Sequence, residues 1–364
     1  MLSPRTATEP VARPVGRGAS PSRAGAAAIW GFALGYFLCY APYSALTKAL
    51  SSGLLAGMDR RGISGFVLLP ISTIASLFGM FTFLTAMGWW RYAGRRTILG
   101  ARVPCPGRWT FLSGVCTAGI IGTTTLAYTF EGASIVFMML LMRGGVLVLA
   151  PMVDVITGRR VRWFSWAGFA LSFGSLLVAF SKKGGLAITV IAACDVALYL
   201  ACYFVRLRFM SRLAKSDDPT ANRRYFVEEQ MVATPAIVTL LALLAIVGAG
   251  DIMRDVRQGF TTFLASGRVL ETVLIGIFSQ GTGIFGGLIL LDKREHTFCV
   301  PVNRASSVLA GVVASYGLMA ALGQRAPSKR ELLGAALIGA ALLVLSLPDA
   351  LARRRAALAA NAAG

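Results

Sequence analysis

The sequence has few charged residues and few groups suited to catalysis or metal binding. Only 14% of its 364 residues are charged, and its single histidine, His296, lies in a DKREH segment that we expect to be a loop. A loop position argues against a His-based triad within the membrane, and a single histidine excludes a His-rich metal cluster. The phosphate-binding patterns GxxxxGKS and GxxxxGKT are missing, which argues against an ATP-driven pump. We therefore expect no enzyme, no cofactor and no metal site.

The cysteines and the basic residues are also informative through the patterns they lack. The six cysteines have no CxxC spacing and fall mostly within apolar segments, where cysteine usually acts as a small core hydrophobe. The net charge of +20 comes from short basic clusters between apolar runs rather than from one continuous basic region. This pattern argues against a nucleic-acid partner and is typical of membrane topology signals.

Apolar residues dominate the chain. They make up 56% of it, more than a soluble domain of this length could bury. A helix that crosses the bilayer needs about 20 apolar residues. Ten segments meet this requirement: 27–49, 64–89, 109–129, 133–156, 163–181, 184–205, 226–250, 270–291, 297–322 and 331–348. We expect residues 1–26 to be a disordered basic arm and 349–364 to be a basic tail.

The distribution of Lys and Arg predicts the orientation of these spans. With a cytoplasmic N-terminus, 23 basic residues lie in inner segments and 10 in outer ones, while Lys48, Arg143 and Arg304 lie within spans. Positive residues gather on the cytoplasmic side of membrane proteins. Both termini are therefore expected in the cytoplasm of a cell whose inner membrane holds the protein.

The two halves of the chain repeat at a nearly constant offset. The matches are Cys39-Tyr40 with Cys202-Tyr203 at 163, Arg143 with Arg304 at 161, Gly158 with Gly323 at 165, and Gly168 with Gly334 at 166. Residues 27–181 and 184–348 each hold five spans, and an odd number turns the second half upside down in the membrane. The predicted fold is an all-α integral membrane protein of ten helices in two inverted five-helix repeats.

Two long stretches carry a resemblance to a known superfamily. They are MRGGVLVLAPMVDVITGRRVRWFSWAGFALSFGSLLVAF in the first half and NRASSVLAGVVASYGLMAALGQRAPSKRELLGAALIGAALLVLSL in the second. In each, a long span precedes a short basic hinge and a glycine-containing apolar helix. With the five-plus-five layout, the chain resembles the drug/metabolite transporter superfamily, meaning EamA-type permeases and their nucleotide-sugar and triose-phosphate relatives. The resemblance implies that the fourth and ninth spans flank a central cavity.

Arg143 and Arg304 are the first candidates for binding. Each lies deep in its span, and the resemblance implies that both could face one cavity. Arginine in a membrane interior is costly and marks a functional site by default. Guanidinium grips carboxylate or phosphate through two parallel hydrogen bonds, so an anionic substrate is predicted. Alternatively, an internal carboxylate or backbone carbonyls neutralise each arginine.

Further candidates lie near these arginines in the predicted cavity. Asp195 could load and release a coupling proton, or it could be the fixed partner of one arginine. Tyr199 follows it at helical spacing and could offer a hydroxyl to substrate. Tyr40 belongs to the repeated Cys-Tyr pair, while Thr124 and Gln280 lie in polar runs of equivalent spans.

Other charged residues are expected at the membrane surface. Lys48 lies close enough to the outer interface for its long side chain to reach water. Glu228 and Glu229 open the seventh span beside Arg223 and Arg224, and we expect them to form an interfacial charge cluster.

Together these features predict a secondary transporter, a permease that moves a small organic anion by alternating access. One alternative is a flippase for a lipid-linked or phosphorylated carrier. Another is a membrane-embedded lipid-modifying enzyme, but the sequence offers no identifiable nucleophile and base pair. The expected partners are a small-molecule substrate and the lipid bilayer, and the sequence leaves open whether the protein forms a homodimer.

Overall fold

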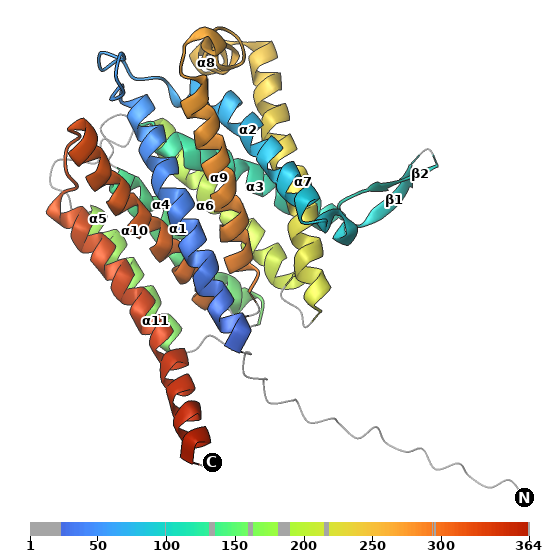
Figure 1. The fold of residues 1–364 in the computed structure, drawn as a ribbon, viewed down its shortest axis with the longest axis vertical. Coiled ribbons are helices and arrows are strands. Elements are labelled where there is room, and N and C mark those ends of the chain that lie inside the picture. The colour runs from blue at the N-terminus through green and yellow to red at the C-terminus, as the bar shows by residue number, and fades with distance from the viewer. Residues whose placement is uncertain are drawn as a thin grey trace, which may run out of the picture.

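A computed structural model describes residues 23–98, 100–130, 135–158, 163–180, 190–214, 218–292, 294 and 296–362. This part of the chain holds eleven α-helices, two short 3-10 helices and one two-stranded hairpin (Figure 1). The elements are α1 (Arg23–Ser51), α2 (Gly65–Ala86), η1 (Trp89–Tyr92), β1 (Arg95–Ile98), β2 (Ala101–Pro104), α3 (Arg108–Ala127), α4 (Ile135–Ile156), α5 (Trp163–Phe180), α6 (Val190–Leu213), α7 (Pro219–Val247), α8 (Gly250–Phe260), η2 (Thr262–Ala265), α9 (Val269–Leu290), α10 (His296–Leu322) and α11 (Lys329–Ala362).

The predicted all-α membrane architecture is confirmed at this level. Each of the ten apolar segments overlaps a helix in its described part, and α8 is an additional short one. Among the described residues, seven helices are long and apolar enough to cross a membrane, namely α2, α3, α4, α6, α7, α9 and α10. The chain is thus a multi-pass membrane protein, with seven candidate spans in the part that the structure describes.

Local sequence sets where several helices begin and end. The Ser64 side chain accepts a hydrogen bond from the backbone N–H of Phe66 at the start of α2. Asp218 accepts one from Thr220 at the start of α7, where Pro219 occupies the first turn. Such N-caps satisfy backbone donors that have no partner within the helix. Gly248 ends α7 at φ +61°, a left-handed conformation that glycine adopts without strain.

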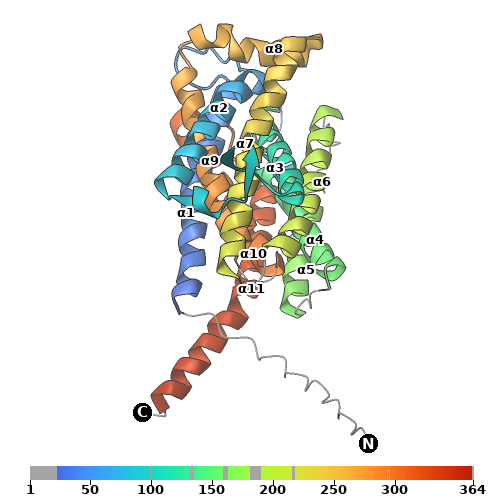
Figure 2. The ribbon, with the colours of Figure 1, turned by 90° about the vertical axis from the view of Figure 1, so that its right-hand side faces the viewer.

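The helices pack in a bundle with an outer pair at one edge. α5 packs against α11, and the two connect to the rest through α4 and α10 respectively. In the interior α1 packs on α9 and α10, α6 packs on α3 and α4, and α2 contacts both α7 and α9. α3 packs on α7, and α4 packs on α10. Figures 1 and 2 place α8 across one end of this bundle, and α1 begins at the opposite end, where α11 ends.

Glycines allow close helix contacts at corresponding places in the two halves. A Cβ atom on Gly119 of α3 would lie 2.7 Å from Cys202 Sγ of α6. A Cβ atom on Gly281 of α9 would lie 2.5 Å from Cys39 Sγ of α1. Because such distances are too short for carbon and sulfur, only glycine fits at these crossings.

A second pair of glycines shows the same correspondence. Gly114 of α3 lies against Glu229 and Val232 of α7, while Gly276 of α9 lies against Ser72 and Ala75 of α2. Both of these contacts involve a backbone carbonyl of the facing helix. The α3 and α9 glycines are 162 positions apart in each case, and the residues they meet on α7 and α2 are 157 apart.

The structure corrects several local predictions. The basic segment 91–108, expected as a loop, contains a β-hairpin with the register Arg95 opposite Pro104. Lys48 does not reach the surface: only 6% of it is exposed, and its Nζ donates to the carbonyl of Phe130 at 3.3 Å. His296 is the first residue of α10 and is buried, so it belongs to the helix rather than to the loop predicted for DKREH.

Candidate functional site

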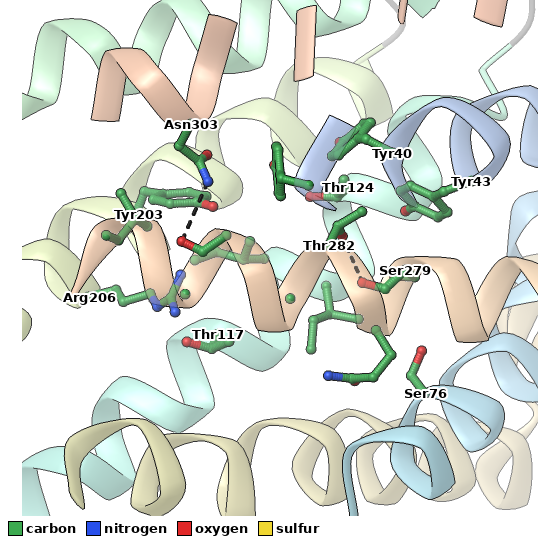
Figure 3. A pocket seen from close by; sticks show the side chains of 18 of the residues that line it. Tyr40, Tyr43, Ser76, Thr117, Thr124, Tyr203, Arg206, Ser279, Thr282 and Asn303 are labelled. Atoms are coloured by element: carbon green, nitrogen blue, oxygen red, sulfur yellow. Dashed lines mark hydrogen bonds between the residues drawn. The ribbon is translucent and has the colours of Figure 1, made fainter. Parts of the chain in front are cut away.

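A cavity lies in the interior of the bundle, between helices from both halves of the chain. It encloses about 650 Å³ of space that atoms do not occupy, including the solvent at its mouth. Figure 3 shows polar side chains that point into it. Its lining comprises Tyr36, Tyr40, Tyr43, Ser76, Thr117, Ile120, Ile121, Thr124, Arg143, Tyr203, Arg206, Gln230, Ser279, Gln280, Thr282, Gly283, Gly286, Gly287, Leu290 and Asn303.

Arg143 reaches this cavity from α4 and is 2% exposed. Its two terminal nitrogens donate to the hydroxyls of Tyr199 and Tyr40. The guanidinium carbon also lies 5.2 Å from the centre of the Tyr40 ring and 5.3 Å from that of Tyr199. Tyr40 in turn bonds to the hydroxyl of Tyr128 at 2.6 Å. Neutral aromatic groups therefore surround the charge.

Arg304 approaches the same point from α10 and is fully buried, and unlike Arg143 it is not among the residues that line the cavity. Its Nη1 donates to the Tyr199 hydroxyl at 3.1 Å, and its guanidinium lies 4.5 Å from the centre of the Tyr203 ring. Among the described residues its Nε and Nη2 have no hydrogen-bond partner. These two atoms form the edge of the guanidinium that can hold both oxygens of a carboxylate or phosphate.

The structure thus brings the two arginines together at one tyrosine hydroxyl. Within the described part of the chain, no ion pair joins either of them to a carboxylate. Buried charges are normally paired, because an isolated ion is costly to remove from water. Two adjacent guanidinium groups without an internal carboxylate give this region a positive charge that an anion would neutralise.

Asp195 lies elsewhere on α6, one helical turn before Tyr199. It is 7% exposed, is not among the residues that line the cavity, and its Oδ2 has no hydrogen-bond partner among the described residues. In that part of the chain no ion pair joins it to Arg143 or Arg304. Of its two predicted roles, the fixed arginine partner therefore has no contact that supports it.

The other predicted residues lie in or beside the cavity. Tyr40, Thr124 and Gln280 line it, and Tyr199 adjoins it through its bond to Arg143. The Nε2 of Gln280 is buried without a hydrogen-bond partner among the described residues. The neighbouring Thr123 instead donates to a carbonyl of its own helix at 2.7 Å, so only part of the threonine run faces the cavity.

Sequence reasoning missed a second charged group at the cavity. Arg206 was counted as a cytoplasmic loop residue, but it lies within α6, lines the cavity and is 5% exposed. Its Nε and Nη2 donate to the two carboxylate oxygens of Glu229 at 2.8 and 2.7 Å. Glu229 also accepts from Ser113 at 2.8 Å and from Thr117 at 3.1 Å. The prediction of an interfacial cluster is therefore wrong for Glu229, which is fully buried.

Glu228 is also buried, but it contacts the segment that contains the β-hairpin. Its two oxygens accept hydrogen bonds from the backbone N–H groups of Gly94 and Gly107, each at 3.0 Å. Thr110 donates to it at 2.7 Å, and Arg224 forms an ion pair with it at 2.7 Å. Glu228 thus has the predicted contact with Arg224, but it is itself buried and also holds both ends of the segment that contains the hairpin.

A stronger repeat signal was present in the sequence. Tyr36-x-x-Cys39-Tyr40 in α1 matches Tyr199-x-x-Cys202-Tyr203 in α6 at an offset of 163, and the next position at helical spacing is Tyr43 in one and Arg206 in the other. Only the central Cys-Tyr pair was used in the prediction. Extending the comparison by one turn in each direction finds Tyr36 and Arg206, both of which line the cavity.

Comparisons with known proteins give a fold but no family. No protein-family model matches the chain, and no curated protein matches it. Twenty chains of solved structures do match. One of these, described only as the crystal structure of a protein, has a TM-score of 0.50 and 16% identity, and the match covers 90% of this chain and 98% of the other. At this identity the likeness concerns the fold alone.

Proposed function

We propose that this chain is a secondary transporter that moves a small organic anion across the inner membrane by alternating access. The observation that carries the proposal is the meeting of Arg143 and Arg304 at the Tyr199 hydroxyl, beside a central cavity and, within the described part of the chain, without an ion pair to a carboxylate. An anion bound there would supply the missing counter-charge. Tyrosine, threonine and amide groups around it would orient the remainder of the solute.

The packing supports an inverted repeat of two five-helix halves. If α1 to α5 correspond in order to α6, α7, α9, α10 and α11, then the α1–α9 contact corresponds to α6–α3, and α1–α10 to α6–α4. The α2–α9 contact likewise corresponds to α7–α3, and α4–α5 to α10–α11. The paired glycine contacts agree with this correspondence. Two inverted halves around a midplane site are the usual plan of alternating-access transporters.

The topology of the proposal follows from the ends of the bundle. α1 begins and α11 ends at the same end (Figure 1), which is consistent with both termini in the cytoplasm. The same layout is typical of the drug/metabolite transporter superfamily, to which we assign the chain as part of this proposal. Transport would be driven by a solute gradient or by exchange, since the sequence has no nucleotide-binding pattern.

A binding screen tests the proposal directly. Detergent-purified protein would be heated with carboxylates, organic phosphates, organic cations and neutral metabolites, and its apparent melting temperature recorded. We expect stabilisation by anions only, because a ligand that binds the folded state raises its stability. Uptake of the selected anion into proteoliposomes would then be measured for the wild type and for Arg143→Lys. Stabilisation by cations or neutral compounds alone would contradict an anion site.

A further inference from the structure

The hairpin β1–β2 has two different faces. Side chains alternate along a strand, and residues opposite each other across the ladder share a face. The register pairs Arg95 with Pro104 and Thr97 with Arg102, so one face carries two arginines and a threonine. The register also pairs Arg96 with Val103 and places Ala101 on that same second face. All of these residues except the half-buried Pro104 are exposed, and Val103 is 40% exposed.

The hairpin lies where two candidate membrane spans meet the water. It connects the end of α2 to the start of α3, and it projects sideways from the bundle rather than along the helices (Figures 1 and 2). Trp109 follows it at the start of α3 and is 46% exposed. Tryptophan is enriched at the boundary between hydrocarbon and water. This position directs the hairpin along the bilayer surface.

Hydrogen bonds hold the base of the hairpin, whereas its outer part is exposed. A two-stranded hairpin by itself is only marginally stable. Here Glu228 of α7 accepts hydrogen bonds from Gly94 and Gly107, which flank the two strands. A Cβ atom on Gly94 would lie 2.9 Å from a Glu228 oxygen, so the glycine is needed for this approach. The hairpin therefore keeps one direction relative to the helices.

The charge of the hairpin is not balanced by the protein. Among the described residues, no ion pair involves Arg95, Arg96 or Arg102. Basic clusters next to a membrane span attract anionic headgroups. Strand pairing with a second copy is disfavoured, because arginine on both strands and Pro104 on one are residues that protect sheet edges from association.

From these observations we propose that the β1–β2 hairpin is an interfacial anchor that binds anionic phospholipids. Arg95 and Arg102 contact the headgroup phosphates from one face, and Ala101 and Val103 on the other face rest against the upper part of the acyl chains. Arg96 shares this second face and extends its long side chain back to the phosphates. This inference rests on the membrane spans and on the hairpin, and it is independent of the transported solute.

The test measures lipid retention by the full-length protein in detergent. Native mass spectrometry would record the number of bound phosphatidylglycerol and phosphatidylcholine molecules as each lipid is titrated. The hairpin variant carries Arg95→Gln, Arg96→Gln and Arg102→Gln. The control variant carries Arg61→Gln, Arg254→Gln and Arg325→Gln, three exposed arginines outside the hairpin, and therefore has the same net charge.

We expect the wild type and the control to retain phosphatidylglycerol in preference to phosphatidylcholine. The hairpin variant should bind phosphatidylglycerol more weakly, by about fivefold for each arginine that contacts a headgroup. Unchanged retention by the hairpin variant would overturn the proposal, as would an equal loss in the control. The same spectra report oligomeric state, and a dimer that dissociates only in the hairpin variant, without lipid loss, would assign the hairpin to a second copy instead.

Discussion

Replacing Arg304 or Arg206 by glutamine should give opposite results, although both are buried arginines beside the same cavity. Arg206 has a carboxylate partner, whereas Arg304 shares a tyrosine hydroxyl with another arginine. We therefore predict that Arg304→Gln folds as well as the wild type but loses affinity for the anion, while Arg206→Gln loses stability.

The energy of the Arg304 site can be estimated from its contacts. Since Arg143 and Arg304 both reach the Tyr199 hydroxyl, their charges lie about 6 to 8 Å apart, and at an effective dielectric constant of about 20 they repel by roughly 2 to 3 kcal/mol. Arg304→Gln removes this repulsion. It also removes a hydrogen bond and a cation–π contact, which contribute about 1 kcal/mol each. The free energy of unfolding should therefore change by less than about 1 kcal/mol.

Arg206→Gln leaves the Glu229 carboxylate buried without its cation. Breaking a buried pair in this way costs about 3 to 5 kcal/mol. At about 2 to 4 °C for each kcal/mol, the apparent melting temperature should fall by roughly 10 °C. The double variant Arg206→Gln with Glu229→Gln removes both charges and should recover most of the loss, since neutral partners of similar volume can replace an ion pair.

The assay combines thermal unfolding in detergent with binding of the anion selected by the screen. The free Nε and Nη2 edge of Arg304 is expected to hold that anion, so Arg304→Gln should weaken binding by about 30- to 150-fold, equivalent to roughly 2 to 3 kcal/mol. If Arg304→Gln destabilised the protein as much as Arg206→Gln, an internal carboxylate would pair with Arg304 and the reasoning would fail. Normal folding with wild-type affinity would refute the anion site.

Three further predictions concern the tyrosine, the glycines and the topology. Tyr199→Phe removes the hydroxyl that both arginines share, and we expect at least about tenfold slower uptake in proteoliposomes with little change in folded yield, whereas unchanged uptake would contradict this role. Gly119→Val and Gly281→Val should lower the melting temperature by similar amounts, because the two helix crossings are equivalent in the repeat. Gly317→Val is the control, since its surroundings are open. A large difference between the first two variants would count against the repeat. A C-terminal alkaline-phosphatase fusion should be inactive, because the basic residues predict a cytoplasmic end, and an active fusion would reverse the proposed orientation.

The helices were predictable because a membrane span is a signal along the chain itself. A run of about 20 apolar residues identifies each helix regardless of what it contacts. The prediction that Arg143 and Arg304 face one cavity came from the resemblance to the drug/metabolite transporter superfamily, and the structure places both at one hydroxyl. The inverted arrangement and the transported solute remain predictions.

The missed features depend on contacts between distant segments. The Arg206–Glu229 pair joins α6 to α7. Arg206 directly follows the predicted span 184–205 and Glu229 lies near the start of 226–250, so both were expected at the membrane surface, and only their contact between two helices shows that they are buried. The hairpin in segment 91–108 was hidden because few apolar residues interrupt its basic and polar residues, and its base is held by Glu228 far along the chain. A short amphipathic ribbon of this kind has too little periodicity for reliable assignment.

The adjacent positions of Glu228 and Glu229 restrict how α7 can move. Consecutive residues on an α-helix point about 100° apart. The Glu228 carboxylate therefore binds the base of the hairpin, while the Glu229 carboxylate binds Arg206 beside the cavity. A helix bound on two sides in this way cannot turn about its own axis without breaking the hydrogen bonds of both carboxylates. Tilting or sliding of α7 as a rigid rod costs less, because the carboxylates can then carry their partners with them. Any conformational cycle of this bundle should therefore leave the orientation of α7 about its own axis unchanged. The hairpin should move whenever α7 moves.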